Sequence, residues 1–80
     1  MKVDMVMPFL SETMEEGTVG VWLKQVGDPV ALGEGLVEIE GDKTSMVYES
    51  DVAGTLVEIL VAEGETVATG HVIARIETGG

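Results

Sequence analysis

Apolar and polar residues alternate in short segments along the whole chain, and glycine-containing turns separate these segments. Alternation with a period of two is typical of strands that bury one face, and no segment keeps a helical stripe long enough to compete. The pattern predicts eight short strands, at 3–7, 18–24, 29–32, 36–40, 45–49, 55–61, 66–69 and 72–77.

The residue types agree with this pattern. Thirteen Val and four Ile favour strands, and eleven Gly supply turns. Eight short strands with close, regular turns are typical of an all-β sandwich or flattened barrel. A chain of 80 residues, 45% of them hydrophobic, is enough for one small domain and its core.

An internal repeat sharpens the predicted architecture. A shift of 37 residues places 17–40 on 54–77 without a gap, and nine of the 24 aligned positions are identical. The repeated glycines fall at predicted turns, which indicates the same backbone geometry in both halves. We therefore expect two four-stranded antiparallel sheets that pack face to face about a pseudo-two-fold axis.

The repeat and the alternation also assign side chains to the core. Trp22 shares its repeat position with Ile59, so we expect it in the core, and we expect the same of Leu60 and Ile76. Met46 and Tyr48 alternate on one side of a predicted strand and are also expected to be buried, which would leave Val47 exposed.

The charge balance excludes several classes of function. Four Lys and Arg stand against fifteen Asp and Glu, a formal net charge of −11. Such a chain repels nucleic acid and anionic membrane surfaces, and it has no apolar run of spanning length. Cysteine is absent, and the single histidine, His71, is most simply a polar turn residue. We therefore expect no metal site, no catalytic residue and a monomeric domain.

One lysine occupies a special place. The two halves of the repeat are joined by an insert whose Gly-Asp-Lys-Thr-Ser segment, 41–45, reads as a tight hairpin between strands. Lys43, one of only three lysines, is expected at its tip. On its own such a lysine is an ordinary solvated charge, so its position between the halves is what makes it a candidate site.

This hairpin resembles the lipoylation hairpin of the 2-oxo acid dehydrogenase complexes. Residues 40–46, Glu-Gly-Asp-Lys-Thr-Ser-Met, contain the Asp-Lys-Thr form of the triplet whose lysine carries lipoate in that family. Residues 7–17 are similar to the family's opening segment, and 26–30, 53–55 and 63–67 match its bends and the start of its second half. The resemblance covers nearly the whole chain and implies a flattened barrel of two four-stranded sheets.

The resemblance implies a carrier function. Lys43 would carry amide-linked lipoate, and Asp42 and Thr44 would be the flanks read by a lipoate ligase or lipoyl transferase. The arm would accept an acyl group from a thiamine-diphosphate-dependent decarboxylase (E1) and present it to an acyltransferase core (E2) for transfer to coenzyme A. A dihydrolipoamide dehydrogenase (E3) would then reoxidise it. The domain itself would not be an enzyme.

The loop after the first strand is the expected recognition surface for the decarboxylase. By resemblance this role falls on Phe9, Leu10, Ser11, Glu12, Thr13, Met14 and Glu15. From the residues alone the same segment is a plain connection between strands. Residues 12–17 favour a pyruvate- or acetoin-type complex over an oxoglutarate-type complex.

Four residues, at three places in the chain, depart from the family pattern. Gly41 stands where Thr, Ser or Val is more usual, Ser11 replaces a Gly, and Ser50-Asp51 replaces Ala-Pro. None of them removes the acceptor lysine. Gly41 would loosen the strand before the turn, and Ser11 changes the loop expected to recognise the decarboxylase.

Two other functions stay open at this point. Biotin carrier domains share the architecture, but their lysine usually lies between two methionines, whereas Lys43 lies between Asp42 and Thr44. The second alternative is an unmodified β-sandwich interaction module in which Lys43 has no special role.

We expect residues 1–78 to form the carrier domain, with half-repeats 17–40 and 54–77, and 79–80 to begin a linker to the rest of a dihydrolipoamide acyltransferase. The expected compartment is the bacterial cytoplasm or the mitochondrial matrix.

Overall fold

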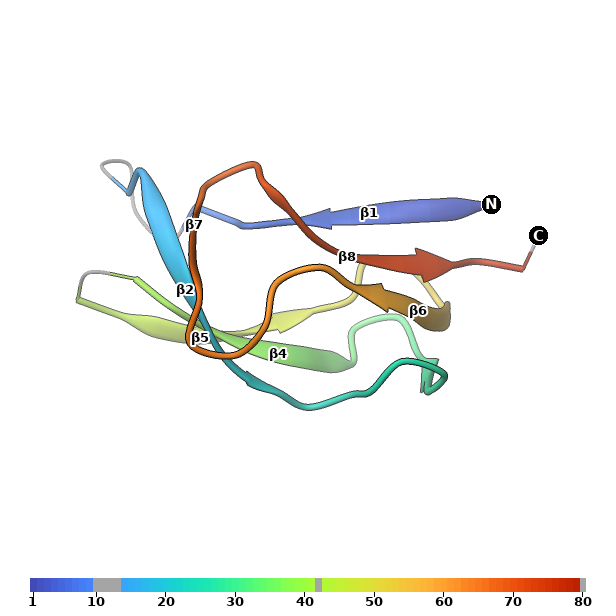
Figure 1. Ribbon diagram of the computed structural model, residues 1–80. Coiled ribbons are helices and arrows are strands. Elements are labelled where there is room, and N and C mark those ends of the chain that lie inside the picture. Colours follow the sequence, from blue (N-terminus) through green and yellow to red (C-terminus); the bar gives the residue numbers. More distant parts are fainter. Residues whose placement is uncertain (10–13, 42, 80) are drawn as a thin grey trace.

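The computed structural model describes residues 1–9, 14–41 and 43–79. Its regular elements are all strands: β1 (Lys2–Val6), β2 (Glu16–Trp22), β3 (Pro29–Val30), β4 (Gly35–Glu40), β5 (Ser45–Glu49), β6 (Gly54–Ile59), β7 (Thr66–Ala68) and β8 (Val72–Glu77). They form two four-stranded antiparallel sheets, as the repeat predicts (Figure 1). The described residues include no helix of the length and apolarity needed to cross a membrane.

The two sheets have the same topology. The first, sheet A, has the order β1-β8-β6-β3, and the second, sheet B, has the order β5-β4-β2-β7. The 37-residue shift turns β2, β3 and β4 into β6, β7 and β8, and β1 then takes the place of β5. This correspondence is the predicted pseudo-two-fold symmetry. Each sheet receives one edge strand from the other half, since β3 pairs with β6 and β7 pairs with β2.

Backbone hydrogen bonds repeat with the symmetry. The N–H of Gly27 donates to the carbonyl of Leu56, and that of Gly64 donates to the carbonyl of Val19, both at 2.7 Å. Gly27 has a φ of 99° and Gly64 a φ of 88°, a conformation that side-chain-bearing residues rarely adopt. These two glycines let the chain turn sharply so that each half bonds to the other.

The symmetry also relates the lysine hairpin to the chain ends. The N–H of Gly41 donates to the carbonyl of Thr44 at 2.7 Å, and the N–H of Thr78 donates to the carbonyl of Met1 at 2.9 Å. The first bond closes the β4–β5 hairpin, and the second joins the two termini at the equivalent place. Figure 1 shows the hairpin at one end of the barrel and the termini at the other. The lysine end is thus the end without the termini.

The core lies between the inner faces of the sheets. Its buried apolar residues come from both halves: Met5, Met7, Met14, Val19, Val30, Leu36, Val37, Ile39, Leu56, Val61, Ile73, Ala74 and Ile76. Trp22 packs against this cluster and donates its Nε1–H to the carbonyl of Val61 at 3.0 Å, so the expected core role holds for its ring.

Two core predictions are wrong. Ile76 is fully buried, but Leu60 lies just beyond β6 and is 43% exposed. Met46 is also 43% exposed, while Tyr48 packs partly against the core and Val47 is exposed as predicted. Met46 is the second residue of β5, which is an edge strand of sheet B, and lies next to the hairpin. The register shift between Leu56 and Glu58 in the β6–β8 pairing explains Leu60, because it breaks the alternation on which the prediction rested.

These burials predict opposite outcomes for two truncations. Ile76→Ala should lower the free energy of unfolding by about 2–5 kcal/mol, because it leaves a cavity between the sheets. Leu60→Ala should lower it by less than about 1 kcal/mol, because the side chain is already partly in water. Urea denaturation measures both, with the milder Ile76→Val as a third variant. Equal losses for Leu60 and Ile76 would contradict the assigned core.

Candidate functional site

The lysine hairpin connects β4 and β5 at the end of sheet B. Glu40 of β4 is paired with Ser45 of β5, and the bond from Gly41 to Thr44 continues the ladder to the last pair before the tip. Gly41 donates this closing bond, although its presence in place of Thr, Ser or Val predicted a looser strand. Asp42 lies outside the described residues. Lys43 is exposed at the tip, where a regular ladder fixes the position of its backbone.

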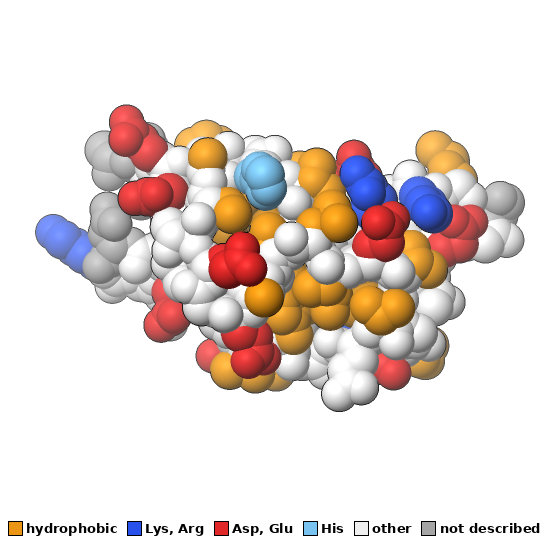
Figure 2. Space-filling model, viewed as in Figure 1, with side chains coloured by type: hydrophobic (Ala, Val, Ile, Leu, Met, Phe, Trp, Pro, Cys, Tyr) orange, Lys and Arg blue, Asp and Glu red, His pale blue; other side chains and the backbone are white. Residues whose placement is uncertain are grey.

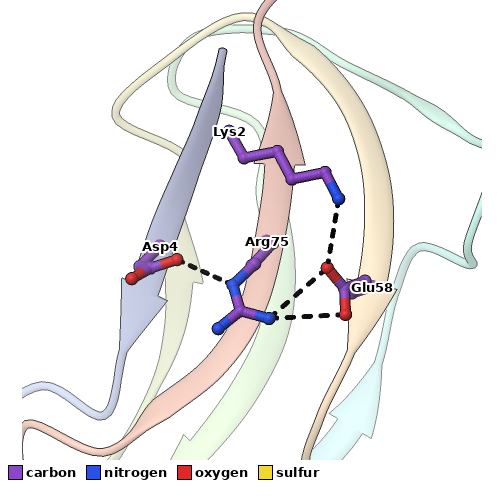
Figure 3. Close-up of polar contacts among 4 residues, drawn as sticks. All are labelled: Lys2, Asp4, Glu58 and Arg75. Carbon is purple, nitrogen blue, oxygen red and sulfur yellow. Dashed lines mark hydrogen bonds and ion pairs between the residues drawn. The ribbon is translucent and has the colours of Figure 1, made fainter.

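Lys43 differs from the other basic groups in its surroundings. The N-terminal ammonium lies 2.6 Å from Oε1 of Glu77, Lys2 lies 3.6 Å from Glu58, and Lys24 lies 2.7 Å from Glu34. Arg75 bridges Asp4 and Glu58 in the group shown in Figure 3. Among the amines and the guanidinium of residues 1–9, 14–41 and 43–79, only Lys43 has no ion pair. Its amine is therefore the lysine amine that no carboxylate of the described residues holds.

The ion pair of Lys24 has a measurable consequence. Oε2 of Glu34 accepts from the Lys24 ammonium, and Oε1 accepts the N–H of Ala31 at 2.9 Å. The hydrogen bond with Lys24, followed by the one with Ala31, holds the pKa of Glu34 below its ordinary value. This pair was not predicted from the sequence, because Glu34 comes ten residues and a turn after Lys24. The one sequence feature that could have indicated it is that a lysine and a glutamate flank the predicted strand 29–32.

The expected recognition loop is only partly described, because Leu10, Ser11, Glu12 and Thr13 lie outside the described residues. Phe9 is 67% exposed, and Glu15 is exposed. Met14 is buried beside Met7 over Gly17, where an added Cβ would lie 2.5 Å from its terminal methyl. Its side chain therefore packs in the core and does not offer a surface to a partner. Because Thr18 of β2 pairs with Glu40, the end of this loop reaches the same end of the barrel as the lysine hairpin.

The surface around the site is acidic. Figure 2 shows carboxylates spread over this view, with basic side chains only at the hairpin end and near the terminal end. His71 is exposed in the turn before β8, as expected of a polar turn residue, and its carbonyl accepts the N–H of Met7 at 2.8 Å. The site is thus a single free amine on a hairpin of an acidic barrel.

The sequence and fold match known proteins over nearly the whole chain. The family model of the biotin–lipoyl proteins, described as biotin-requiring enzyme, matches residues 3–76. The chain is 52% identical over 73 residues to the acetyltransferase component of the pyruvate dehydrogenase complex of Corynebacterium glutamicum, covering 91% of this chain and 11% of that protein. It is 49% identical over 72 residues to the succinyltransferase component of the 2-oxoglutarate dehydrogenase complex of Staphylococcus saprophyticus, covering 90% and 17%.

Two further matches agree with these. The acetyltransferase component of the acetoin cleaving system of Bacillus subtilis is 45% identical over 76 residues, which are 95% of this chain and 19% of that protein. The solved lipoyl domain of the 2-oxoglutarate dehydrogenase complex from Azotobacter vinelandii is 35% identical, with a TM-score of 0.81 and coverage of 98% of this chain and 99% of that one. The chain spans less than a fifth of the length of the three curated relatives.

A barrel of two symmetric sheets that presents one lysine on a hairpin defines a class of carrier domains. The chain belongs to the biotin–lipoyl family and is a lipoyl domain of the kind found in the acyltransferase components of 2-oxo acid dehydrogenase complexes. A domain of this kind carries a group between active sites and is not itself an enzyme.

The ion pairs predict an order of amine reactivity. Among the three lysines, a limiting amount of an amine-reactive ester should modify Lys43 first and Lys24 last, since Lys24 is held by Glu34 and its side chain is only 22% exposed. Peptide mapping by mass spectrometry measures the order. Glu34→Gln should speed the labelling of Lys24 and leave Lys43 unchanged. Faster labelling of Lys24 than of Lys43 in the unaltered domain would contradict the assignment.

The same pair predicts a pH dependence. Because the pKa of Glu34 is lowered in the folded state, its contribution to stability is present above the unfolded pKa and is lost as the pH falls through the folded pKa. An NMR titration of the Glu34 carboxyl should give a midpoint below the ordinary range, and Lys24→Met should raise it. A midpoint that does not respond to Lys24→Met would refute the role of the ion pair.

Proposed function

We propose that Lys43 carries lipoate in amide linkage and that the domain is the mobile acyl carrier of a dihydrolipoamide acyltransferase. The observation that carries this proposal is the position of Lys43 on a lipoyl-domain fold: exposed at a hairpin tip, and without an ion pair among the described residues. The proposal includes Asp42 and Thr44 as the flanks read by the ligase.

The geometry suits the chemistry of attachment. Amide formation needs an accessible amine, and Lys43 is exposed and forms no ion pair with a described residue. Attachment would make the domain one unit more negative than its net charge of −11. When bound, lipoate would supply a disulfide that accepts an acyl group and electrons. The residues of the barrel would hold its attachment point and leave the arm free to move.

A carrier of this kind works through proximity. Joined to an acyltransferase core, the arm would meet each active site at a high effective concentration, even where the domain binds weakly. The termini lie at the end of the barrel opposite the hairpin, so segments connecting the domain to a longer chain would not obstruct Lys43. The proposed partners are the ligase or lipoyl transferase, the E1 decarboxylase, the E2 core and E3.

We infer a pyruvate- or acetoin-type complex from residues 12–17. The relatives named for pyruvate and acetoin systems support it, but a 2-oxoglutarate relative is 49% identical, so the assay below includes all three decarboxylases. The relatives are bacterial proteins, which favours the bacterial cytoplasm over the mitochondrial matrix.

Lipoate is favoured over biotin, although the family includes both groups. Lys43 has Asp42 and Thr44 beside it in place of the two methionines typical of biotin acceptors. The curated relatives cited above are named as dihydrolipoyllysine-residue acyltransferase components.

Incubation of the domain with a lipoate ligase, lipoate and ATP should add one lipoyl group, detected by intact mass. Lys43→Gln should abolish the addition, because the acceptor amine is gone, while the melting temperature stays unchanged. A parallel incubation with a biotin ligase should leave the mass unchanged.

A position control separates the hairpin geometry from the presence of a lysine. The double variant Asp42→Lys with Lys43→Asp keeps the composition but moves the amine by one position, which changes its direction. We expect it to be modified far more slowly than the unaltered domain. Modification at Lys2 or Lys24, or by biotin alone, would overturn the proposed function.

A further inference from the structure

The outer faces of the two sheets differ at places where their backbones are equivalent. On sheet A, the central row across β1, β8 and β6 consists of Asp4, Arg75 and Glu58, with Asp4 paired to Arg75 and Arg75 paired to Glu58 in the strand register. The 37-residue shift places Arg75 on Glu38 and Glu58 on Val21. The matching registers Lys2–Glu77 and Ser45–Glu40 place Asp4 on Val47.

The row on sheet A satisfies its own charges. Nε of Arg75 lies 2.9 Å from Asp4, and its Nη1 lies 3.4 Å from both carboxylate oxygens of Glu58. Lys2 adds a further contact to Glu58 at 3.6 Å. Figure 3 shows the arginine lying between the two acidic side chains. Sheet A therefore needs no partner for this row.

The equivalent row on sheet B has the opposite character. Val21 is 50% exposed and Val47 is 42% exposed, and between them Glu38 replaces the arginine. Glu38 is exposed and takes part in none of the ion pairs found among the described residues. Sheet B thus has an exposed carboxylate between two exposed valines at the place where sheet A has the ion pairs of Arg75 with Asp4 and Glu58.

A third apolar side chain enlarges this surface. Leu23 is 47% exposed and, with Val47, covers Gly35: a Cβ added there would lie 2.7 Å from Cγ1 of Val47 and 3.6 Å from Cδ1 of Leu23. Because Gly35 has no side chain, these two side chains lie close to the sheet and to each other. We call Val21, Leu23, Val47 and Glu38 the sheet B patch.

We infer that the sheet B patch is a docking surface for the E1 decarboxylase, which would present an apolar side chain together with an arginine or lysine. The difference in charge at one equivalent place is the reason: sheet A supplies Arg75 from its own chain, whereas Glu38 has no ion pair with a described residue and can accept a cationic side chain from a partner. Apolar contact and a paired charge at one small site are a typical combination at protein interfaces. This inference rests on the proposed function.

The position of the patch favours the decarboxylase over the ligase. Its residues lie along sheet B on the side of β4 away from Lys43: the Glu38–Val47 pair comes two ladder positions before the Glu40–Ser45 pair, and Leu23 bonds to Leu36 farther from the hairpin. A protein bound there would leave the hairpin tip uncovered. A lipoylated arm must enter an active site, and docking on the sheet leaves the hairpin free to do so. A ligase must instead hold the hairpin itself. A small patch also implies weak, rapidly reversible binding, which suits a domain that visits several enzymes.

The symmetry provides the sharpest test. The triple variant Val21→Glu, Glu38→Arg, Val47→Asp copies the row of sheet A onto sheet B and leaves the net charge unchanged. Long-range attraction to a basic partner is therefore preserved, while the patch is replaced by a group that satisfies itself. We expect normal lipoylation by intact mass, and a fall of at least about tenfold in kcat/KM for reductive acylation by the decarboxylase.

A matched pair of single variants covers the case in which the triple variant does not fold. Leu23 and Leu60 are repeat equivalents with similar exposure, 47% and 43%, and their N–H groups donate to the carbonyls of Leu36 and Ile73, both at 2.8 Å. Leu23→Asp should slow reductive acylation severalfold, because it lies in the patch. Leu60→Asp adds the same charge on sheet A and should leave the rate unchanged.

The assay uses fully lipoylated domains with the pyruvate, acetoin and 2-oxoglutarate decarboxylases in turn. If the unaltered domain is not lipoylated, or none of the three acylates it, the proposed function fails. If the unaltered domain is acylated and the variants of the patch react equally well, the docking surface is refuted and the carrier function stands. Slow lipoylation of the variants with normal acylation afterwards would also refute it, because the patch would then serve the ligase.

Discussion

The barrel depends on the exchange of edge strands between its halves. The short strand β3 leaves the first half and pairs with β6, and β7 leaves the second half and pairs with β2. The turns that permit this exchange bring Gly27 and Gly64 into a left-handed conformation and join each to the opposite half by a backbone hydrogen bond. Neither sheet is therefore complete without the other half of the chain, and the core between them forms as one unit.

The same symmetry explains why one end of the barrel is free to carry a lysine. The hairpin closed by Gly41 and Thr44 has its equivalent where Thr78 meets Met1. Met1 and Thr78 meet at one of these two equivalent sites, and the other is the continuous hairpin that contains Lys43. The paired strands β4 and β5 lead to Lys43, whose side chain is exposed.

Most of the fold could be predicted because the alternation of apolar and polar residues marks each strand, and the 37-residue repeat shows the same pattern in both halves. The predicted class, the two four-stranded sheets, their symmetry and the burial of Ile76 are confirmed. The predictions for Leu60 and Met46 are wrong, because strict alternation ignores the register shift in β6–β8 and the place of Met46 on an edge strand next to the hairpin. The position of Lys43 could be predicted from the insert between the repeats. Its freedom from ion pairs could not, since the engagement of Lys24 by Glu34 depends on how two turns fold against each other.

The net charge of −11 is distributed unevenly over the domain. Three of the four basic side chains, Lys2, Lys24 and Arg75, are used inside the domain, and two of these neutralise the outer face of sheet A. Carboxylates without an ion pair among the described residues lie elsewhere on the surface, and Glu38 and Glu40 of sheet B are two of them. Because opposite charges attract over about a Debye length, a partner with a basic surface would be drawn preferentially to sheet B, the side that leads to Lys43. The repeat supplies two equivalent frameworks, and the few differences between them give the central row of sheet A its own ion pairs and leave Glu38 on sheet B without one among the described residues.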